Sequence, residues 1–256
     1  TAQEATDLLA EQGVEVTPHP WLENCLILNK TGNLERLDAY GQGLFYVQDP
    51  ASRLMALASG AAPGMRVLDM CAAPGGKSFA AAIQMDNQGE VISCDLHPHK
   101  KKLIQAGADR LGLSIIKPMT ADGKVRREEW VSAFDLVLVD APCSGLGVIR
   151  KKPDIRYKDP KPLEDLPPVQ QAILENAAGY VKAGGVLMYS TCTILPRENG
   201  EVVSAFLEKH PEFVREAFEL PGAAGRVEAG EITLWPQVHQ TDGFFICKLR
   251  KVGETP

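Results

Sequence analysis

The chemically most distinctive residues lie in the stretch 134–145, which reads Phe-Asp-Leu-Val-Leu-Val-Asp-Ala-Pro-Cys-Ser-Gly. Residues 134–139 are almost wholly apolar, as in a central parallel strand that is covered on both faces. Asp140 and Cys143 then fall at the carboxyl end of this strand, where open α/β sheets place their ligands. A thiol beside a carboxylate, read together with Cys192 further along the chain, indicates covalent chemistry with a cysteine nucleophile.

A second motif, Val-Leu-Asp-Met-Cys-Ala-Ala-Pro-Gly-Gly-Lys-Ser, occupies residues 67–78 at the end of another expected strand. A glycine-containing turn that opens a helix lets the backbone approach a nucleotide-like ligand closely, with helix amides available to its polar groups. A phosphate-binding Walker loop would need glycine where Cys71 stands, so residues 76–78 match that motif only in part. A G-x-G-x-x-G dinucleotide fingerprint is absent from the sequence.

Two aspartates follow the next two expected strands. Asp95 closes one of them, about where an acidic residue binds ribose hydroxyls in nucleotide-binding folds, although an aspartate here also suits a helix cap. Asp122 follows the other and is placed to meet an adenine amino group, although a turn aspartate before glycine is the commoner use. With Gly75 and Gly76, these carboxylates predict a pocket for an adenosine-bearing ligand.

The elements that position these residues alternate between strand and helix from residue 66 onward, which predicts an α/β fold with a doubly wound, mostly parallel sheet. Strands are expected at 66–70, 91–95, 115–119, 134–140, 185–190 and 244–249, and helices near 77–85, 99–111, 168–181 and 197–209.

The flanking segments are less regular. Residues 1–60 indicate a small mixed α/β region, with a helix near 2–12, short strands around 14–16 and 26–29, and an apolar helix that ends at residue 58. The charged, proline-rich segment 150–167 is expected to be a loop, and so long a loop inside a compact domain is usually functional or mobile.

Composition limits the class of protein. A chain of 256 residues with 45% hydrophobic content can bury one large core, or one core and a small appendage. No apolar run approaches the roughly 20 residues of a membrane-spanning helix, and no signal-peptide pattern is present, so we expect a cytoplasmic protein without a membrane partner. The six cysteines include no C-x-x-C pair, so neither a disulfide framework nor a metal site is indicated. Because the first residue is Thr1 and not methionine, we expect an amino-terminal part to have been removed or left unrecorded.

Charge indicates a local nucleic-acid surface. The net charge of −6 argues against a protein that coats nucleic acid. Basic clusters at 100–102 and 126–127 suit solvated surfaces, whereas a third cluster directly follows the 140–147 loop and can hold a phosphate backbone beside the expected site. The residues that we expect to shape this third segment are Arg150, Lys151, Lys152, Asp154 and Arg156, and its basic character continues to Lys158.

Four ordered motifs resemble those of the RNA cytosine-5 methyltransferases, the relatives of the bacterial Sun (or Fmu) small-subunit ribosomal RNA enzyme. They are Cys-Ala-Ala-Pro-Gly-Gly-Lys at 71–77, Asp-Ala-Pro-Cys-Ser-Gly at 140–145, Arg-Lys-Lys-Pro-Asp-Ile at 150–155, and Tyr-Ser-Thr-Cys-Thr at 189–193 with Glu198-Asn199. The similarity runs from about residue 48 to the Thr-Asp-Gly-Phe-Phe near the end of the chain. Tyr157 stands where many members have tryptophan.

This resemblance implies a Rossmann-like, S-adenosylmethionine-dependent methyltransferase fold with a seven-stranded sheet over residues 61–256. Residues 1–60 resemble only the linking region that follows the NusB-like domain of Sun-type members, and this chain lacks that domain. The implied methyl donor is S-adenosylmethionine and the implied acceptor is a flipped or single-stranded cytosine in RNA, with ribosomal RNA expected. Transfer RNA as the substrate, or a non-catalytic RNA-binding or assembly role, remain the alternatives, and the oligomeric state stays open.

The resemblance also implies roles for individual residues. Carbon 5 of cytosine is a poor nucleophile, so a thiolate must first add to carbon 6. The Pro-Cys at 142–143 fits the nucleophile position of DNA cytosine-5 methyltransferases, but the RNA family places the nucleophile in the later Thr-Cys. Cys192 is therefore expected to attack, and Cys143 to promote product release. Asp140 is expected to bond near nitrogen 3, and Lys77 to orient Asp140, to contact the substrate or to be structural. The expected cofactor-binding residues are Cys71, Ala72, Ala73, Pro74, Gly75, Gly76, Lys77, Asp95, Asp122 and Asp140.

Overall fold

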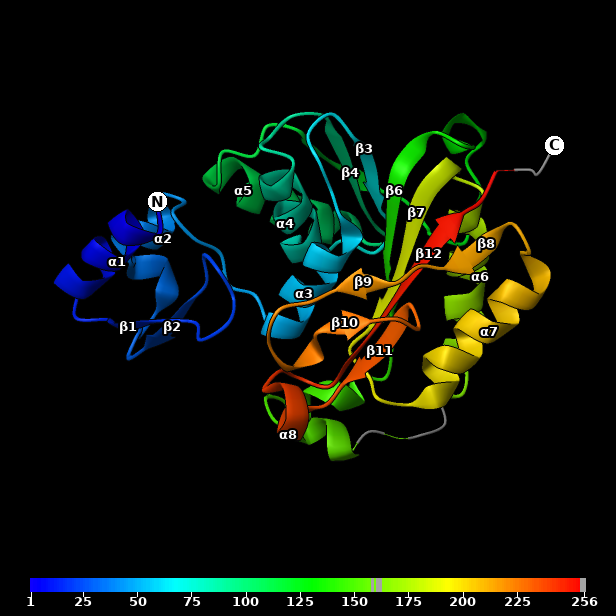
Figure 1. Ribbon diagram of the computed structural model, residues 1–256. Coiled ribbons are helices and arrows are strands. Elements are labelled where there is room, and N and C mark those ends of the chain that lie inside the picture. Colours follow the sequence, from blue (N-terminus) through cyan, green and yellow to red (C-terminus); the bar gives the residue numbers. More distant parts are fainter. Residues whose placement is uncertain (158, 160–162, 254–256) are drawn as a thin grey trace.

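Eight strands form the central sheet of the computed structural model, which describes residues 1–157, 159 and 163–253 (Figure 1). Along the sheet the order is β11-β12-β7-β6-β3-β4-β5, and β8 pairs with β12. β7, β6, β3, β4 and β5 are parallel, whereas β8, β11 and β12 pair antiparallel. The strands are β3 (Arg66–Asp69), β4 (Glu90–Asp95), β5 (Ile116–Thr120), β6 (Phe134–Asp140), β7 (Val181–Thr191), β8 (Phe213–Arg215), β11 (Glu231–Leu234) and β12 (Phe244–Lys251). The predicted Rossmann-like α/β fold is confirmed, with eight strands where seven were expected.

Helices cover both faces of the sheet, and each face has its own core (Figure 1). Alternate side chains of a strand point to opposite faces, so Leu136 and Leu138 of β6 pack on one side while Val137 and Val139 pack on the other. β6 is therefore buried on both faces, as its apolar run predicts. The first face is covered by α3 (Pro50–Ser59), α4 (Gly76–Gln84) and α5 (Pro98–Arg110), and the second by α6 (Leu166–Ala178) and α7 (Gly200–Lys209).

Local sequence sets the bounds of α3. The Asp49 carboxylate caps its amino end by accepting a hydrogen bond from the Ala51 N–H at 2.8 Å. Pro50 occupies the first turn, where no N–H is needed. Gly60 ends the helix with a φ of 69°, a left-handed conformation that glycine adopts without strain.

Tertiary contacts shorten α6 relative to its prediction. The helix predicted over 168–181 ends at Ala178, and the chain passes through Gly179 into β7. The Gly179 carbonyl accepts a hydrogen bond from the Ser132 N–H at 2.9 Å, so the backbone here bonds to a distant segment instead of continuing the helix. Hydrophobic periodicity alone does not reveal such a partner.

The segment between α7 and β12 holds short elements that periodicity did not predict. Besides β8 and β11 it contains the β9–β10 pair and a short helix, and strands of two to four residues depend on their partners more than on their own sequence. These elements are β9 (Phe218–Glu219), β10 (Arg226–Val227) and α8 (Pro236–His239). The segment 150–167, expected to be a loop, contains a 3-10 turn at Pro153–Tyr157 and the start of α6, while residues 158 and 160–162 lie outside the described part.

The amino-terminal residues form a small unit to one side of the sheet (Figure 1). Its elements are α1 (Ala2–Glu11), β1 (Glu15–Pro18), β2 (Leu26–Asn29) and α2 (Asp38–Gly41), around a core of Leu9, Val14, Leu37 and Ala39. The mixed α/β character expected here is thus present. α3, which lies before residue 60, packs into the main core, and the division of the chain at residue 60 stays a prediction.

Arg110 at the end of α5 anchors this amino-terminal unit to the sheet-bearing part. Its Nη1 donates hydrogen bonds to the Tyr40 carbonyl at 2.8 Å and to the Phe45 carbonyl at 2.9 Å. The guanidinium also lies over the Tyr40 ring, 3.8 Å from its centroid. A single side chain thus provides two charge-assisted hydrogen bonds and a cation–π contact between the two parts.

We expect Arg110→Ala to loosen the amino-terminal unit. Loss of hydrogen bonds from a charged donor should lower the free energy of local opening by about 2 kcal/mol. Hydrogen–deuterium exchange should therefore accelerate over residues 1–45 and stay unchanged in the central strands. Lys101→Ala, at an exposed position of the same helix, is the matched control. Unchanged exchange in Arg110→Ala would show that the anchor contributes nothing.

In the described residues, no helix has both the length and the apolar character needed to cross a bilayer.

Candidate active site

The pairing of β6 with β7 brings the chemically distinctive residues together at the carboxyl edge of the sheet. Asp140, the last residue of β6, is in register with Ser190 of β7. The Ser190 hydroxyl donates to Asp140 Oδ1 at 2.8 Å, and Lys77 Nζ donates to Oδ2 at 2.6 Å. Both oxygens of this carboxylate are therefore held, so its orientation is fixed.

Lys77 lies in the first turn of α4 and reaches across to β6. Its side chain is 11% exposed, and its ammonium lies 3.4 Å from Ser52 Oγ and 5.3 Å from the centroid of the Phe244 ring. Burial lowers the pKa of Lys77, but the Asp140 carboxylate outweighs this effect and the net shift is upward. Lys77 thus makes the contact with Asp140 that one of the three roles left open by the sequence requires.

Two thiols meet beside this ion pair. Cys143 follows β6 and Cys192 follows β7, and their sulfur atoms are 3.3 Å apart. The hydrogen bond from the Cys143 thiol lowers the pKa of Cys192, and the Lys77 ammonium adds to this effect while burial opposes it. The same hydrogen bond, together with burial, raises the pKa of Cys143. Cys192 is thus the sulfur that more readily becomes the nucleophilic thiolate.

Hydrogen bonds between the two thiol-bearing loops fix this geometry. The Ser144 hydroxyl donates to Thr193 Oγ1 at 2.8 Å, and the Gly147 N–H donates to the Cys192 carbonyl at 3.0 Å. Gly147 is also pressed against the chain before β12, because a Cβ placed on it would lie 1.8 Å from the Gly243 carbonyl oxygen. Only glycine fits this position, which holds the two loops and the start of β12 in contact.

Glu198 and Asn199 form hydrogen bonds with the segments that carry the two thiols. The helix predicted from residue 197 begins at Gly200, because Pro196–Glu198 forms a 3-10 turn and Asn199 departs from helical geometry. The fully buried Glu198 carboxylate accepts hydrogen bonds from the Ser144 N–H at 2.9 Å and from the Gln170 side chain at 3.0 Å. The Asn199 side chain accepts from the Thr191 hydroxyl at 2.5 Å. The sequence offered only the position of this pair in a motif, and these contacts supply its role.

The glycine turn after β3 is joined to the end of β4. The Ala72 N–H donates to the Cys94 carbonyl at 2.7 Å, and a cis peptide links Ala73 to Pro74. Gly75 has a φ of 117°, which strongly favours glycine, and a Cβ there would lie 2.4 Å from the Phe79 ring. Gly76 and Lys77 then start α4, whose amino end has no side-chain cap. Burial and the negative charge of nearby carboxylates raise the pKa of the Cys71 thiol well above its usual value.

Asp95 and Asp122 occupy the carboxyl ends of the adjacent strands, as predicted. Asp95 is buried, and its Oδ1 accepts from the His97 N–H at 3.1 Å. Asp122 Oδ1 accepts from the Lys124 N–H at 2.9 Å. Asp122 therefore serves the local turn that the sequence offered as an alternative, whereas Asp95 is not the helix cap suggested for it, because the N-cap residue of α5 is His97. In the described part of the protein, Oδ2 of each aspartate carries no hydrogen bond. These second oxygens remain available as acceptors for a ligand.

A buried carboxylate, that of Asp69, directly precedes the glycine turn in the sequence. Asp69 is fully buried at the end of β3, and its Oδ2 accepts a hydrogen bond from the Ser78 hydroxyl at 2.7 Å. The Ser93 hydroxyl in turn donates a hydrogen bond to Ser78 Oγ at 2.7 Å. Burial raises the pKa of Asp69 to about 6, although the hydrogen bond from Ser78 and the charge of Lys77 oppose the shift.

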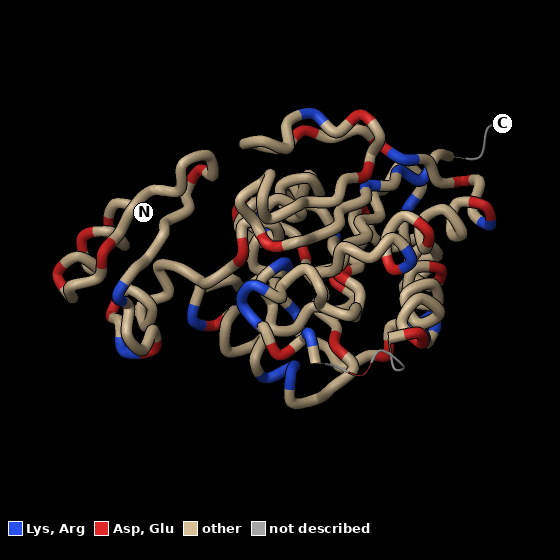
Figure 2. Tube along the Cα trace, turned by 90° about the horizontal axis from the view of Figure 1, so that it is seen from below, with Lys and Arg blue, Asp and Glu red and all other residues tan. Residues whose placement is uncertain are grey.

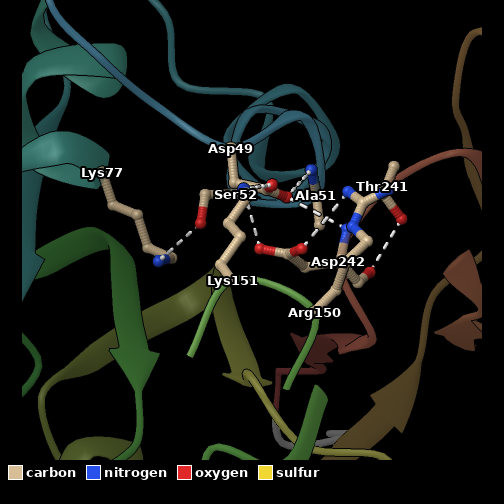
Figure 3. Close-up of polar contacts among 8 residues, drawn as sticks. All are labelled: Asp49, Ala51, Ser52, Lys77, Arg150, Lys151, Thr241 and Asp242. Atoms are coloured by element: carbon tan, nitrogen blue, oxygen red, sulfur yellow. Dashed lines mark hydrogen bonds and ion pairs between the residues drawn. The ribbon is translucent and has the colours of Figure 1, made fainter. Parts of the chain in front are cut away.

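The basic segment after η3 (Leu146–Val148) is tied to two carboxylates, a group that we call the Lys151 clasp (Asp49, Arg150, Lys151 and Asp242; Figure 3). Lys151 Nζ pairs with Asp49 and lies 2.9 Å from Asp242 Oδ2, and Arg150 lies 3.5 Å from Asp242 Oδ1. Burial raises the pKa of Asp242, whereas hydrogen bonding from Lys151 overcomes burial and lowers that of Asp49. The clasp joins the start of α3, the basic segment and the turn before β12.

The other predicted residues of this segment are more open to solvent. Lys152, Asp154 and Arg156 are exposed, and Arg156 Nε donates to the Pro153 carbonyl at 3.2 Å. Seen from below, Lys and Arg positions along the trace are interspersed with Asp and Glu positions (Figure 2). Within the described ranges, no three His, Cys, Asp or Glu side chains converge as metal ligands.

Comparison with known proteins places this geometry in a family. The family model for the 16S rRNA methyltransferase RsmB/F matches residues 56–250. The chain belongs to the RsmB/F family. The resemblance read from four motifs is thereby confirmed, as is the S-adenosylmethionine-dependent methyltransferase fold that it implies.

Three relatives of this RsmB/F chain illustrate the match. The probable ribosomal RNA small subunit methyltransferase B of Bacillus subtilis (strain 168) is 44% identical over 256 residues, which cover 98% of this chain and 57% of that protein. The crystal structure of PH0851 gives a TM-score of 0.90 at 33% identity and covers 97% of this chain and 56% of that one. NSun6 from Pyrococcus horikoshii, solved with SFG, gives 0.73 at 30% identity, with 87% and 57% covered. The chain thus spans about half the length of such relatives.

We expect Cys143→Ala to raise the pKa of Cys192, because it removes the hydrogen bond that stabilises the thiolate. Alkylation of Cys192 by iodoacetamide, followed across pH by mass spectrometry of its peptide, should then reach half its maximal rate at a higher pH. Cys25→Ala, at a partly buried cysteine away from the thiol pair, should leave the Cys192 profile as in the unsubstituted chain. An unchanged or lower midpoint in Cys143→Ala would contradict the inferred hydrogen bond.

Asp69 should make folding stability depend on pH. The folded protein holds this proton up to a pH of about 6 and the unfolded chain releases it near 3.8, so the free energy of unfolding falls as pH rises between these values. The loss amounts to about 3 kcal/mol at pH 7. Measured by urea unfolding, the free energy of unfolding of Asp69→Asn minus that of the unsubstituted chain should therefore increase by about that amount between pH 4 and 7. Asp38→Asn, at an exposed aspartate, should show no such trend.

Proposed function

We propose that this chain is the catalytic part of an RNA cytosine-5 methyltransferase that transfers methyl from S-adenosylmethionine to a cytosine of small-subunit ribosomal RNA. The observation that carries the proposal is the meeting of two thiols, 3.3 Å apart, beside an aspartate whose two oxygens are both held. Membership of the RsmB/F family supports ribosomal RNA methylation. The chemistry of the thiol pair supports carbon 5 of cytosine as the position modified.

Cys192 is the nucleophile in this proposal. Its thiolate sulfur forms a bond to carbon 6, and the electrons of the carbon 5–carbon 6 double bond shift toward carbon 5 and nitrogen 3. As charge develops, nitrogen 3 takes up a proton from solvent, and the resulting N–H donates to the Asp140 carboxylate at the same edge. Lys77 holds Asp140 in position through its 2.6 Å contact.

Cys143 acts in product release. Once carbon 5 carries the methyl group, a base must remove the carbon 5 proton so that the electrons of that C–H bond restore the double bond and expel the Cys192 sulfur. The Cys143 thiol is already hydrogen-bonded to Cys192 and stabilises the departing thiolate by donating that hydrogen bond. Its raised pKa keeps it protonated, so the hydrogen bond to the thiolate is retained.

The turn at 71–77 and the two strand-end aspartates fit S-adenosylmethionine, which supplies the methyl group when bound. The glycine turn brings the backbone close to a ligand, and the uncapped amino end of α4 offers free N–H groups. Asp95 Oδ2 can accept from ribose hydroxyls and Asp122 Oδ2 from the adenine amino group, because each carboxylate uses only Oδ1 in its own turn. These residues would hold the methyl donor at the same carboxyl edge of the sheet as the thiol pair.

Methyl transfer and its dependence on Cys192 test the proposal together. Naked small-subunit ribosomal RNA should accept radiolabelled methyl from S-adenosylmethionine as 5-methylcytosine, and Cys192→Ala should reduce the rate by at least about 10³-fold because no other thiolate replaces the nucleophile. Cys25→Ala is the matched control and should retain full activity. Label in bulk transfer RNA alone would overturn the ribosomal substrate, and full activity of Cys192→Ala would overturn the nucleophile.

Cys143→Ala should separate addition from release. The adduct between Cys192 and carbon 6 should still form but resolve slowly, so a covalent protein–RNA complex should accumulate on denaturing gels. The doubly substituted Cys143→Ala/Cys192→Ala protein should form none. Accumulation of the adduct in Cys192→Ala in place of Cys143→Ala would reverse the two assignments.

A further inference from the structure

A cavity of about 570 Å³ is lined by residues that follow each of the two cysteines in the chain. Its apolar walls come from Leu146, Ile155 and Leu195, and its polar lining includes Arg156, Arg197 and Glu201. Pockets of roughly 300–1,000 Å³ hold ligands of small-molecule size, and a nucleotide falls within that range. Of these residues only Arg156 has a role predicted from the sequence, in the basic segment expected to hold a phosphate backbone, and that prediction did not include a cavity.

The cavity has a fixed place relative to the two sulfurs. Leu146 comes three residues after Cys143, and Leu195 comes three residues after Cys192. Three extended residues span at most about 11 Å between Cα atoms, so the Cα atom of each leucine lies within that distance of the Cα atom of a cysteine. The Gly147 bond to the Cys192 carbonyl holds the two loops together, so the cavity and the thiol pair form one rigid arrangement.

The lining combines apolar surface with unneutralised positive charge. Ile155, which lines the cavity, is only 8% exposed and is therefore packed against the rest of the protein. Arg197 makes no hydrogen bond or ion pair with any part of the chain that the structure describes. Among the same residues, Arg156 donates from Nε to the Pro153 carbonyl, and its guanidinium lies 5.6 Å from the centroid of the Tyr157 ring. Both guanidinium groups therefore keep donors for a phosphate, which they bind in a bidentate manner.

We propose that this cavity binds the nucleotide next to the target cytosine in the substrate RNA. The neighbouring base packs against Leu146, Ile155 and Leu195, and its phosphate is held by Arg156 and Arg197. A cytosine that leaves its stack to reach Cys192 separates from its neighbour, and single-stranded RNA is recognised by holding such unstacked bases on apolar and guanidinium surfaces. The inference rests on the proposed function, since it assumes an RNA substrate.

Glu201 gives the cavity a preference among bases. Its carboxylate only accepts hydrogen bonds, so it favours a base edge with an exocyclic amino group over one with a carbonyl in the same place. The Glu201 carboxylate also repels phosphate, so the RNA backbone is directed toward Arg156 and Arg197, which line the same cavity. The bound base is therefore one that carries an amino group.

Two variants test the phosphate and base contacts separately. Arg197→Gln should raise the KM for naked small-subunit ribosomal RNA roughly tenfold and reduce the slope of log affinity against log salt by about one, with kcat within twofold. Leu195→Ala should raise KM by a similar factor, roughly fivefold to tenfold, without changing the salt slope. Arg36→Gln, at an exposed arginine of the amino-terminal unit, is the matched control and should match the unsubstituted chain.

Affinity for a fluorescein-labelled, single-stranded RNA of mixed sequence, measured by anisotropy across salt concentrations, keeps the two proposals distinct. If both variants retain the unsubstituted KM, affinity and salt slope while methyl is transferred, the cavity does not bind RNA and the inference is overturned. If no methyl is transferred but Arg197→Gln still weakens binding and lowers the slope, the inference holds and the proposed reaction fails. If the unsubstituted chain binds no RNA at all, both are overturned.

Discussion

The parallel pairing of β6 with β7 is the constraint on which the rest of the site depends. Because Asp140 and Ser190 are in register, the loops that follow the two strands leave the sheet at neighbouring points of one edge. Cys143 lies three residues beyond the first point and Cys192 two beyond the second, which suffices to bring the sulfurs to 3.3 Å. A shift of one residue would turn alternate side chains to the opposite face and separate carboxylate from hydroxyl.

The charged groups at this edge are stable only as a connected set. A partly buried ammonium or carboxylate alone would lose most of its hydration, and the loss of one partner of such a pair costs more than the pair contributes. Lys77 and Asp140 meet this cost through their mutual contact and through the hydroxyls of Ser52 and Ser190. Asp69 has no ion pair with the residues that the structure describes, and burial instead raises its pKa to about 6. The apolar strands beneath supply the packing that tolerates these groups.

The sequence predicts structural features that depend on neighbouring residues, but it does not predict contacts between residues that are distant in the chain. The apolar run of β6 and the glycine turn after β3 are short patterns, and they sufficed to predict the sheet and the residues at its carboxyl edge. The Lys151 clasp could not be predicted, because Asp49 and Asp242 lie 102 residues before and 91 after Lys151 and meet only through the topology of the sheet. The early end of α6 has the same cause, since its competing hydrogen bond comes from Ser132.

The clasp also changes how the basic segment after η3 is interpreted. A run of Arg and Lys beside a site suggests phosphate binding, but a cation that already has two carboxylate partners at close range contributes little net field to a phosphate. Asp242 is 4% exposed, so its charge is poorly screened and holds Lys151 firmly. Arg156 and Arg197 line the apolar cavity and have no carboxylate partner in the described part of the chain, so in the proposed complex they retain more charge for a phosphate than Lys151 does. In an acidic chain, such selective neutralisation would favour a correctly placed RNA strand over general adhesion, if the proposed substrate is bound there.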